Sequence, residues 1–155
     1  MKHSPNILTS FLDLLKVKHT KTFTEQTFNE HPHKYNLFGL SKMLSDYGVN
    51  NESIEVSDKE QNITNIQPPF IAQFGADFVA VEKVDAEQVS FFWKGVHQVL
   101  PKDKFTREWS GIVLLAEATE KSGEPDFKIH RQAEILALTK QVAFISASIL
   151  TDFTI

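Results

Sequence analysis

The spacing of the apolar residues changes near Val49 from a helical period to an extended one, and this change strongly constrains the fold. Upstream of it, over residues 6–18 and from Leu37 to Tyr47, apolar residues recur three and four positions apart, as in amphipathic helices. Downstream of it, apolar residues alternate with polar ones or form short apolar runs, as they do in strands. Helices that precede a run of strands predict an α+β fold.

Capping residues predict where the second and third helices begin and end. Thr22 and Glu25 resemble a capping box that would open a short second helix, and Pro32 would stop it. Asn36 is expected to cap the third helix, and Gly48 stands where a left-handed residue would end it.

The strands are predicted to form an antiparallel meander, because short turns with glycine or acidic residues separate the apolar runs. A short helix is expected between Pro101 and Trp109. The predicted strands cover residues 54–56, 70–74, 77–84, 89–93, 96–100 and 112–115.

A polar turn at Ser122–Pro125 indicates a boundary. We predict a domain over residues 1–120, followed over residues 121–155 by a linker and a charged helix. From Val142 to Leu150 the tail becomes apolar, but this stretch is far shorter than the roughly 20 residues that span a bilayer. The tail is therefore either the start of a membrane-entry segment or a docking helix.

Composition excludes several functions. With 16 Lys and Arg against 20 Asp and Glu, the formal charge is −4, so we expect no nucleic acid as a partner. The absence of cysteine excludes disulfides, thiolate metal sites and thiol catalysis. The pair His31 and His33 lacks the further ligands that zinc requires, and no glycine-rich phosphate loop is present, so neither a metal nor a cofactor is expected.

Two residues at predicted strand ends are candidates for a binding site. Asp77 opens an apolar strand directly after a glycine turn, which would place its carboxylate at the rim of the sheet. Trp93 ends a strand before Lys94-Gly95. The plainer interpretations are turn chemistry for the aspartate and cross-strand packing for the tryptophan.

Residues 7–117 resemble the papain-like cysteine peptidase domain of bacteriocin exporters, which cleaves leader peptides after a double glycine. The resemblance lies in the helix Leu37-Phe38-Gly39-Leu40-Ser41 that ends at Gly48, in the strand after Pro69, and in the strand Asp77-Phe78-Val79-Ala80-Val81. It implies a papain-like fold, with N-terminal helices packed on a twisted antiparallel sheet.

The same resemblance implies that the catalytic groups are replaced. Carried over by position, the family's cysteine falls near Ile7, its histidine on Asp77 and its aspartate near Trp93. The oxyanion-hole glutamine has no counterpart within residues 1–6. Thiolate attack needs a sulfur, a base and oxyanion donors, so the chain is expected not to be an enzyme.

A narrower resemblance concerns the degenerate peptidase-like domain that precedes vitamin K epoxide reductase-family membrane proteins in Bacteroidetes. It rests on three segments, residues 31–37, residues 105–111 and above all Ser122-Gly123-Glu124-Pro125-Asp126-Phe127. It implies association with a membrane domain at the cytoplasmic face of the bacterial inner membrane. The chain contains no redox cysteine of its own.

These observations predict a non-catalytic peptidase-like module of a membrane redox protein or exporter, which binds a peptide or a membrane-domain partner. Asp77 and Trp93 would line the former substrate groove. Two alternatives stay open: an active cysteine peptidase domain that cleaves double-glycine leader peptides, and a structural cap without a soluble ligand.

Overall fold

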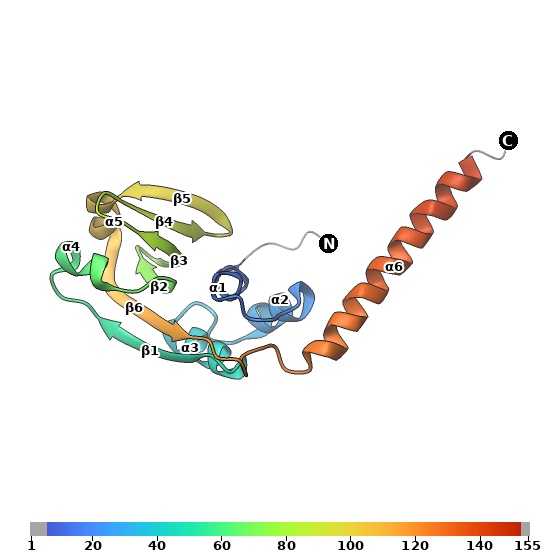
Figure 1. Ribbon diagram of the computed structural model, residues 1–155, viewed down its shortest axis with the longest axis horizontal. Helices are drawn as coiled ribbons and strands as arrows, with labels where there is room; N and C mark the ends of the chain where they lie inside the picture. The colour runs from blue at the N-terminus through green and yellow to red at the C-terminus, as the bar shows by residue number, and fades with distance from the viewer. Residues whose placement is uncertain (1–5, 153–155) are drawn as a thin grey trace. The chain divides into compact units, whose positions relative to one another are not determined.

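The computed structural model describes residues 6–152, with side chains up to residue 147, and shows an antiparallel six-stranded sheet with helices on both faces (Figure 1). This architecture confirms the predicted α+β class. The helices are α1 (Ile7–Leu15), α2 (Lys21–Glu30), α3 (Leu37–Asp46), α4 (Lys59–Asn62), the 3-10 turn η1 (Ile63–Asn65), α5 (Lys102–Glu108) and α6 (Phe127–Asp152). The strands are β1 (Asn50–Glu55), β2 (Phe70–Phe74), β3 (Asp77–Val84), β4 (Gln88–Trp93), β5 (Val96–Pro101) and β6 (Trp109–Glu117).

The sheet has the strand order β1-β6-β2-β3-β4-β5. Strands β2 to β5 form the predicted meander, whereas β6 inserts between β1 and β2. Because β3 and β4 are antiparallel, the first residue of β3 and the last residue of β4 lie toward the same end of the sheet. Asp77 and Trp93 occupy these two positions.

Each face of the sheet has its own hydrophobic core. On one face, α1 and α3 pack against the inward residues of β2, β3 and β6. This core includes Phe11 of α1, Leu40 of α3 and Ala80 of β3. On the other face, η1 and α5 contribute Ile63 and Phe105, which pack with Phe70 and its neighbours. Coverage on both faces explains why β3 carries the uninterrupted apolar run Phe78–Val81.

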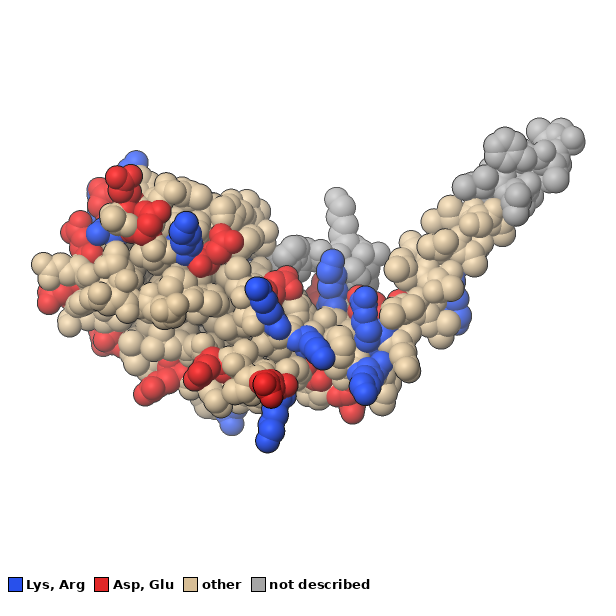
Figure 2. Space-filling view, in the orientation of Figure 1, with Lys and Arg blue, Asp and Glu red and all other residues tan. Residues whose placement is uncertain are grey.

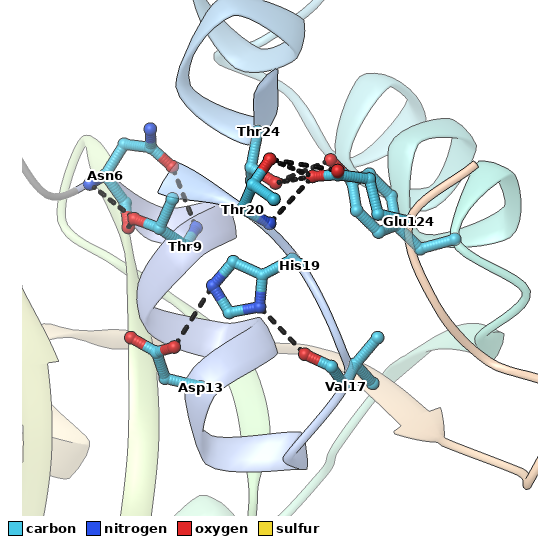
Figure 3. A network of polar contacts seen from close by, with 9 residues as sticks. Asn6, Thr9, Asp13, Val17, His19, Thr20, Thr24 and Glu124 are labelled. Carbon is cyan, nitrogen blue, oxygen red and sulfur yellow. Dashed lines mark hydrogen bonds and ion pairs between the residues drawn. The ribbon is translucent and has the colours of Figure 1, made fainter. Parts of the chain in front are cut away.

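The capping predictions are partly confirmed. The Asn36 side chain accepts a hydrogen bond of 2.9 Å from the Gly39 amide at the start of α3, as expected. The predicted Thr22 capping box is wrong, because α2 begins at Lys21 after Thr20, whose side chain makes no local cap. A capping box lies instead at α1, where Asn6 and Thr9 exchange hydrogen bonds (Figure 3).

The Thr20 side chain is turned toward a glutamate more than one hundred residues away in the chain. Glu124 is 4 % exposed, and its carboxylate accepts hydrogen bonds from the Thr20 amide, the Thr20 hydroxyl and the Thr24 hydroxyl, all at 2.9–3.0 Å (Figure 3). The Thr24 hydroxyl in turn lies 2.7 Å from the Tyr47 hydroxyl. A negative charge at the N-terminus of α2 is also favoured by the helix dipole.

The backbone beside Glu124 is held as firmly as its side chain. The Glu124 amide donates to the Lys18 carbonyl and the Gly123 amide donates to the Tyr47 carbonyl, both at 2.8 Å. The Ser122 hydroxyl donates to the Gly48 carbonyl at 2.7 Å. This segment therefore joins the α1–α2 connection to the end of α3, and the compact unit runs to Pro125.

The second unit is α6, whose described side chains include many exposed apolar ones. Within the described residues, no helix combines the length and the apolarity that a membrane crossing requires.

Replacing the buried carboxylate tests its role. We expect Glu124→Ala to lower the free energy of unfolding by about 3 kcal/mol, because two hydroxyls and one amide would lose their acceptor. Urea unfolding followed by circular dichroism would measure this, with Glu120→Ala, an exposed glutamate, as the matched control. Equal midpoints for the two variants would contradict the assignment.

The Tyr47 phenol gives a second test, at alkaline pH. Burial raises the pKa of Tyr47 from its ordinary value of 10.0 to about 12, and the nearby Glu124 carboxylate adds to the rise. Because the phenol ionises first in the unfolded chain, its contribution to stability is complete below pH 10 and is lost as the pH rises toward 12.

We therefore expect about 2 kcal/mol of stability to disappear over that interval, a loss that Tyr47→Phe would remove. Unfolding free energies measured at several pH values would show it. Tyr35→Phe, at an exposed tyrosine, is the control and should keep the wild-type slope. A Tyr47→Phe slope equal to that of wild type would argue against the buried phenol as its source.

Candidate functional site

A cavity of about 190 Å³ lies at the end of the sheet where β3 begins and β4 ends. Its walls come from the start of α1, the end of α2, the α2–α3 loop, the turn and first residues of β3, and the end of β4 with the turn that follows it. The residues that line it are Asn6, Ile7, Phe28, Lys34, Tyr35, Ala76, Asp77, Phe78, Trp93 and Lys94. The structure thus brings the two predicted site residues, Asp77 and Trp93, into one cavity.

Asp77 and Trp93 are in direct contact. The indole Nε1 of Trp93 donates a hydrogen bond to Oδ2 of Asp77 at 3.1 Å. The Nζ of Lys94 lies 3.9 Å from the same oxygen and 5.8 Å from the centre of the indole ring. Because the side chains of Lys94 and Asp77 are 76 % and 45 % exposed, water screens this ion pair, and the hydrogen bond to Trp93 is the more specific contact.

Trp93 also has a packing role. The Trp93 ring packs against Phe74 with ring centroids 5.6 Å apart, so its inner edge belongs to the core. Lys94 and Gly95 have φ angles of 51° and 77°, as a two-residue hairpin turn requires. The turn fixes the position of Trp93, and the indole Nε1 edge of Trp93 still reaches the cavity.

Ile7 is the first residue of α1 and lines the same cavity. The Asn6–Thr9 capping box fixes the start of this helix. The cavity therefore presents a carboxylate, two lysines, an aliphatic side chain and four aromatic rings. These groups suit the binding of a polar and partly apolar ligand, but none of them supplies a thiolate.

The other candidate residues do not converge into a metal site. The His31 Nδ1 accepts a hydrogen bond from the His33 amide at 3.0 Å. The His97 Nε2 lies 2.9 Å from a carboxylate oxygen of Glu82 on the exposed part of the sheet. Among the described residues, no group of three potential ligands is positioned to hold a metal ion.

Sequence reasoning missed Phe28, Lys34 and Tyr35 as part of the cavity. They come from the end of α2 and the loop after it, far in sequence from Asp77. Only the packing of the helices against the sheet brings them together. The one available signal was the dense run of aromatic and basic residues from His31 to Phe38.

Helices α1 to α3 on a six-stranded antiparallel sheet, with the start of α1 and the start of β3 at one cavity, form a papain-like fold. The sequence profile of the peptidase C39 family matches residues 8–121, and the chain belongs to that family.

Solved structures share the fold. The peptidase domain of Streptococcus ComA, a bifunctional ABC transporter involved in a quorum-sensing pathway, matches with a TM-score of 0.61 and 14 % identity, over 74 % of this chain and 90 % of that one. A double-glycine motif protease from an AMS/PCAT transporter, in complex with the leader peptide, matches with a TM-score of 0.61 and 15 % identity, over 72 % and 83 %.

A third structure is the peptidase C39-like domain of the toxin secretion ATP-binding protein from Vibrio parahaemolyticus, with a TM-score of 0.58, 14 % identity, and coverage of 74 % and 98 %. No curated protein sequence matches the chain significantly. At these identities the structural likeness establishes the fold. The family is established by the sequence profile.

Because the chain has no cysteine, an introduced thiol tests whether positions 7 and 77 face each other. A neighbouring imidazole and a helix N-terminus both lower the pKa of a thiol. We expect Ile7→Cys/Asp77→His to be alkylated by iodoacetamide at neutral pH roughly tenfold faster than Ile7→Cys alone. Mass spectrometry would give both rates.

Ser10→Cys, one turn further along α1, is the matched control and should gain nothing from Asp77→His. Equal rates for Ile7→Cys with and without Asp77→His would show that these two positions do not correspond to a nucleophile and its base.

Proposed function

We propose that this chain is a non-catalytic member of the peptidase C39 family that binds a peptide segment in the cavity lined by Asp77 and Trp93. The observation that carries the proposal is the complete lack of cysteine in a domain that keeps the family's fold and a cavity at the start of α1. A cysteine peptidase needs a thiolate, and no other side chain at the cavity replaces it.

The contact between Asp77 and Trp93 supports this interpretation. In the family resemblance, the histidine falls on Asp77 and the aspartate that orients it falls near Trp93. Here a carboxylate accepts a hydrogen bond from an indole N–H at 3.1 Å, so the donor and the acceptor have exchanged positions. Two complementary replacements preserve a linked pair at the rim of the cavity, but they remove the imidazole that serves as the base in the family resemblance.

The cavity is suited to a peptide. Oδ1 of Asp77 is an additional acceptor for a backbone amide, and Trp93, Tyr35 and Phe28 offer aromatic faces to an apolar side chain. A cavity of about 190 Å³ is sufficient for one or two side chains rather than for a large cofactor.

A displayed peptide library, panned against the chain, tests this function. We expect enriched peptides to bind the wild-type chain and to lose at least about tenfold in affinity for Trp93→Ala or Asp77→Ala, because the central aromatic and charged contacts of an interface dominate its affinity. Val99→Ala, an exposed valine on β5 outside the cavity, is the control.

Two outcomes would contradict the proposal. If no peptide is enriched, the domain acts as a structural cap. If a double-glycine leader peptide is specifically cleaved, the domain is an active peptidase, and its nucleophile is not a cysteine.

The proposal includes a cellular location, in which the domain is attached to a membrane protein. The resemblance to the domain before vitamin K epoxide reductase-family proteins, together with the exposed apolar residues of α6, supports attachment to a membrane redox protein or exporter at the cytoplasmic face of the inner membrane. Fractionation of native cells, blotted with an antibody to this domain, would give a large membrane-bound band. A soluble band near 17.6 kDa would contradict the attachment.

A further inference from the structure

Aromatic and basic side chains continue from the cavity onto the neighbouring surface. Phe28 and Tyr35, which line the cavity, make an edge-to-face contact with centroids 6.3 Å apart. His33 makes a similar contact with Phe38 at 5.8 Å. We call the group formed by His31, His33, Lys34, Tyr35, Phe38 and Lys42 the aromatic–basic patch.

Two large aromatic side chains of this patch are exposed to solvent. Tyr35 is 77 % exposed and Phe38 is 61 % exposed. Each ring has a lysine ammonium over it, Lys34 at 5.2 Å from the centre of Tyr35 and Lys42 at 5.4 Å from the centre of Phe38. Large exposed aromatic side chains are typical of surfaces that bind another molecule.

The loop that carries the patch is held in one shape. A Cβ atom at Gly39 would lie 1.8 Å from the His33 carbonyl oxygen, so only glycine allows the loop to approach α3 this closely. Asn36 caps the helix at that point, and the Lys34 Nζ donates to the Asn29 carbonyl at 2.9 Å. A preordered loop loses little conformational entropy when a ligand binds.

The charge of this region is opposite to that of the whole chain. Residues 31–42 contain two lysines, two histidines and no acidic residue, although the chain carries a formal charge of −4. The acidic residue nearest in sequence before this region is Glu30, whose carboxylate accepts a hydrogen bond from the Gln26 side chain at 3.0 Å. Within the cavity, Lys34 and Lys94 outnumber the single carboxylate of Asp77. On the face of the molecule that Figure 2 shows, acidic (red) and basic (blue) side chains are mixed.

From this combination we infer that the aromatic–basic patch and the cavity together bind an acidic peptide segment that also carries aromatic or aliphatic side chains. The inference rests on the proposed peptide-binding function and specifies the chemistry of the peptide. Its carboxylates would pair with the lysines, while an apolar side chain would contact Tyr35 and enter the cavity beside Trp93.

The test uses three short peptides that carry a neutral dye and alternate phenylalanine or leucine with glutamate, glutamine or lysine. Fluorescence anisotropy with the full chain would give their affinities at low and at high salt. We expect the glutamate peptide to bind at least about tenfold more tightly than the other two at low salt, and the preference to shrink at high salt.

The variant Lys34→Gln/Lys42→Gln should lose most of the preference for the glutamate peptide, and Tyr35→Ala/Phe38→Ala should weaken the binding of all three peptides. Lys83→Gln/Lys104→Gln, at two exposed lysines outside the patch, is the matched control and should bind as the wild type does. Thermal unfolding of each variant would confirm that it is folded.

The outcomes separate this inference from the proposed function. Peptide binding that depends on Trp93 but shows no preference for glutamate, or that survives Lys34→Gln/Lys42→Gln unchanged, would overturn only the inference. If none of the three peptides binds at either salt concentration while a peptide selected from the library does bind, only the inference fails; if no library peptide binds either, the proposed peptide-binding function fails with it.

Discussion

The packing of α1 against the middle of the sheet is the interaction on which the rest of the structure depends. Leu8, Phe11 and Leu12 are fully buried and share one core with Ile71 and Leu114 of the central strands. Burial of each such side chain contributes about 2 kcal/mol to the free energy of folding. Because this contact fixes α1 on the sheet, the first residue of α1 lies at the cavity where β3 begins and β4 ends.

A second constraint fixes the other wall of the cavity. The Glu124 carboxylate is bound at the N-terminus of α2, and the segment around it joins the α1–α2 connection to the end of α3. These contacts determine where α2 starts, and so where Phe28 and the loop after it lie. The residues that shape the cavity therefore depend on a glutamate that does not line it.

The elements were largely predictable from local patterns, but the sheet order and the cavity were not. The helical spacing in residues 37–47, the cap at Asn36 and the turns of the meander are short-range signals, and the structure confirms them. The insertion of β6 between β1 and β2 has no local signature, because it depends on which distant strand best completes the core.

The wrong prediction for the start of α2 also arises from a contact between residues far apart in the sequence. Thr22 and Glu25 fit the capping pattern, but the helix begins two residues earlier, after Thr20, which binds the distant Glu124. By contrast, Asp77 and Trp93 were identifiable as strand-end residues, and the antiparallel pairing of β3 and β4 brings them to the same end of the sheet, where they form a hydrogen bond. Lys34 and Tyr35 could not be placed beside them, because only tertiary packing brings the α2–α3 loop to that end of the sheet.

The stability of this domain rests mainly on residues other than those at the family's catalytic positions, which explains how the fold persists without a cysteine. The buried side chains of α1, α3 and the central strands lie in the two cores, whereas positions 7, 77 and 93 line the cavity and are partly exposed. Ile7 and Trp93 pack only at the edges of these cores, so replacing them removes fewer core contacts than replacing a fully buried residue does. What such replacements do change is the set of groups that meet a ligand. In this chain that set is a carboxylate bound to an indole, bordered by lysines and aromatic rings, and the proposed binding of a peptide rests on these groups.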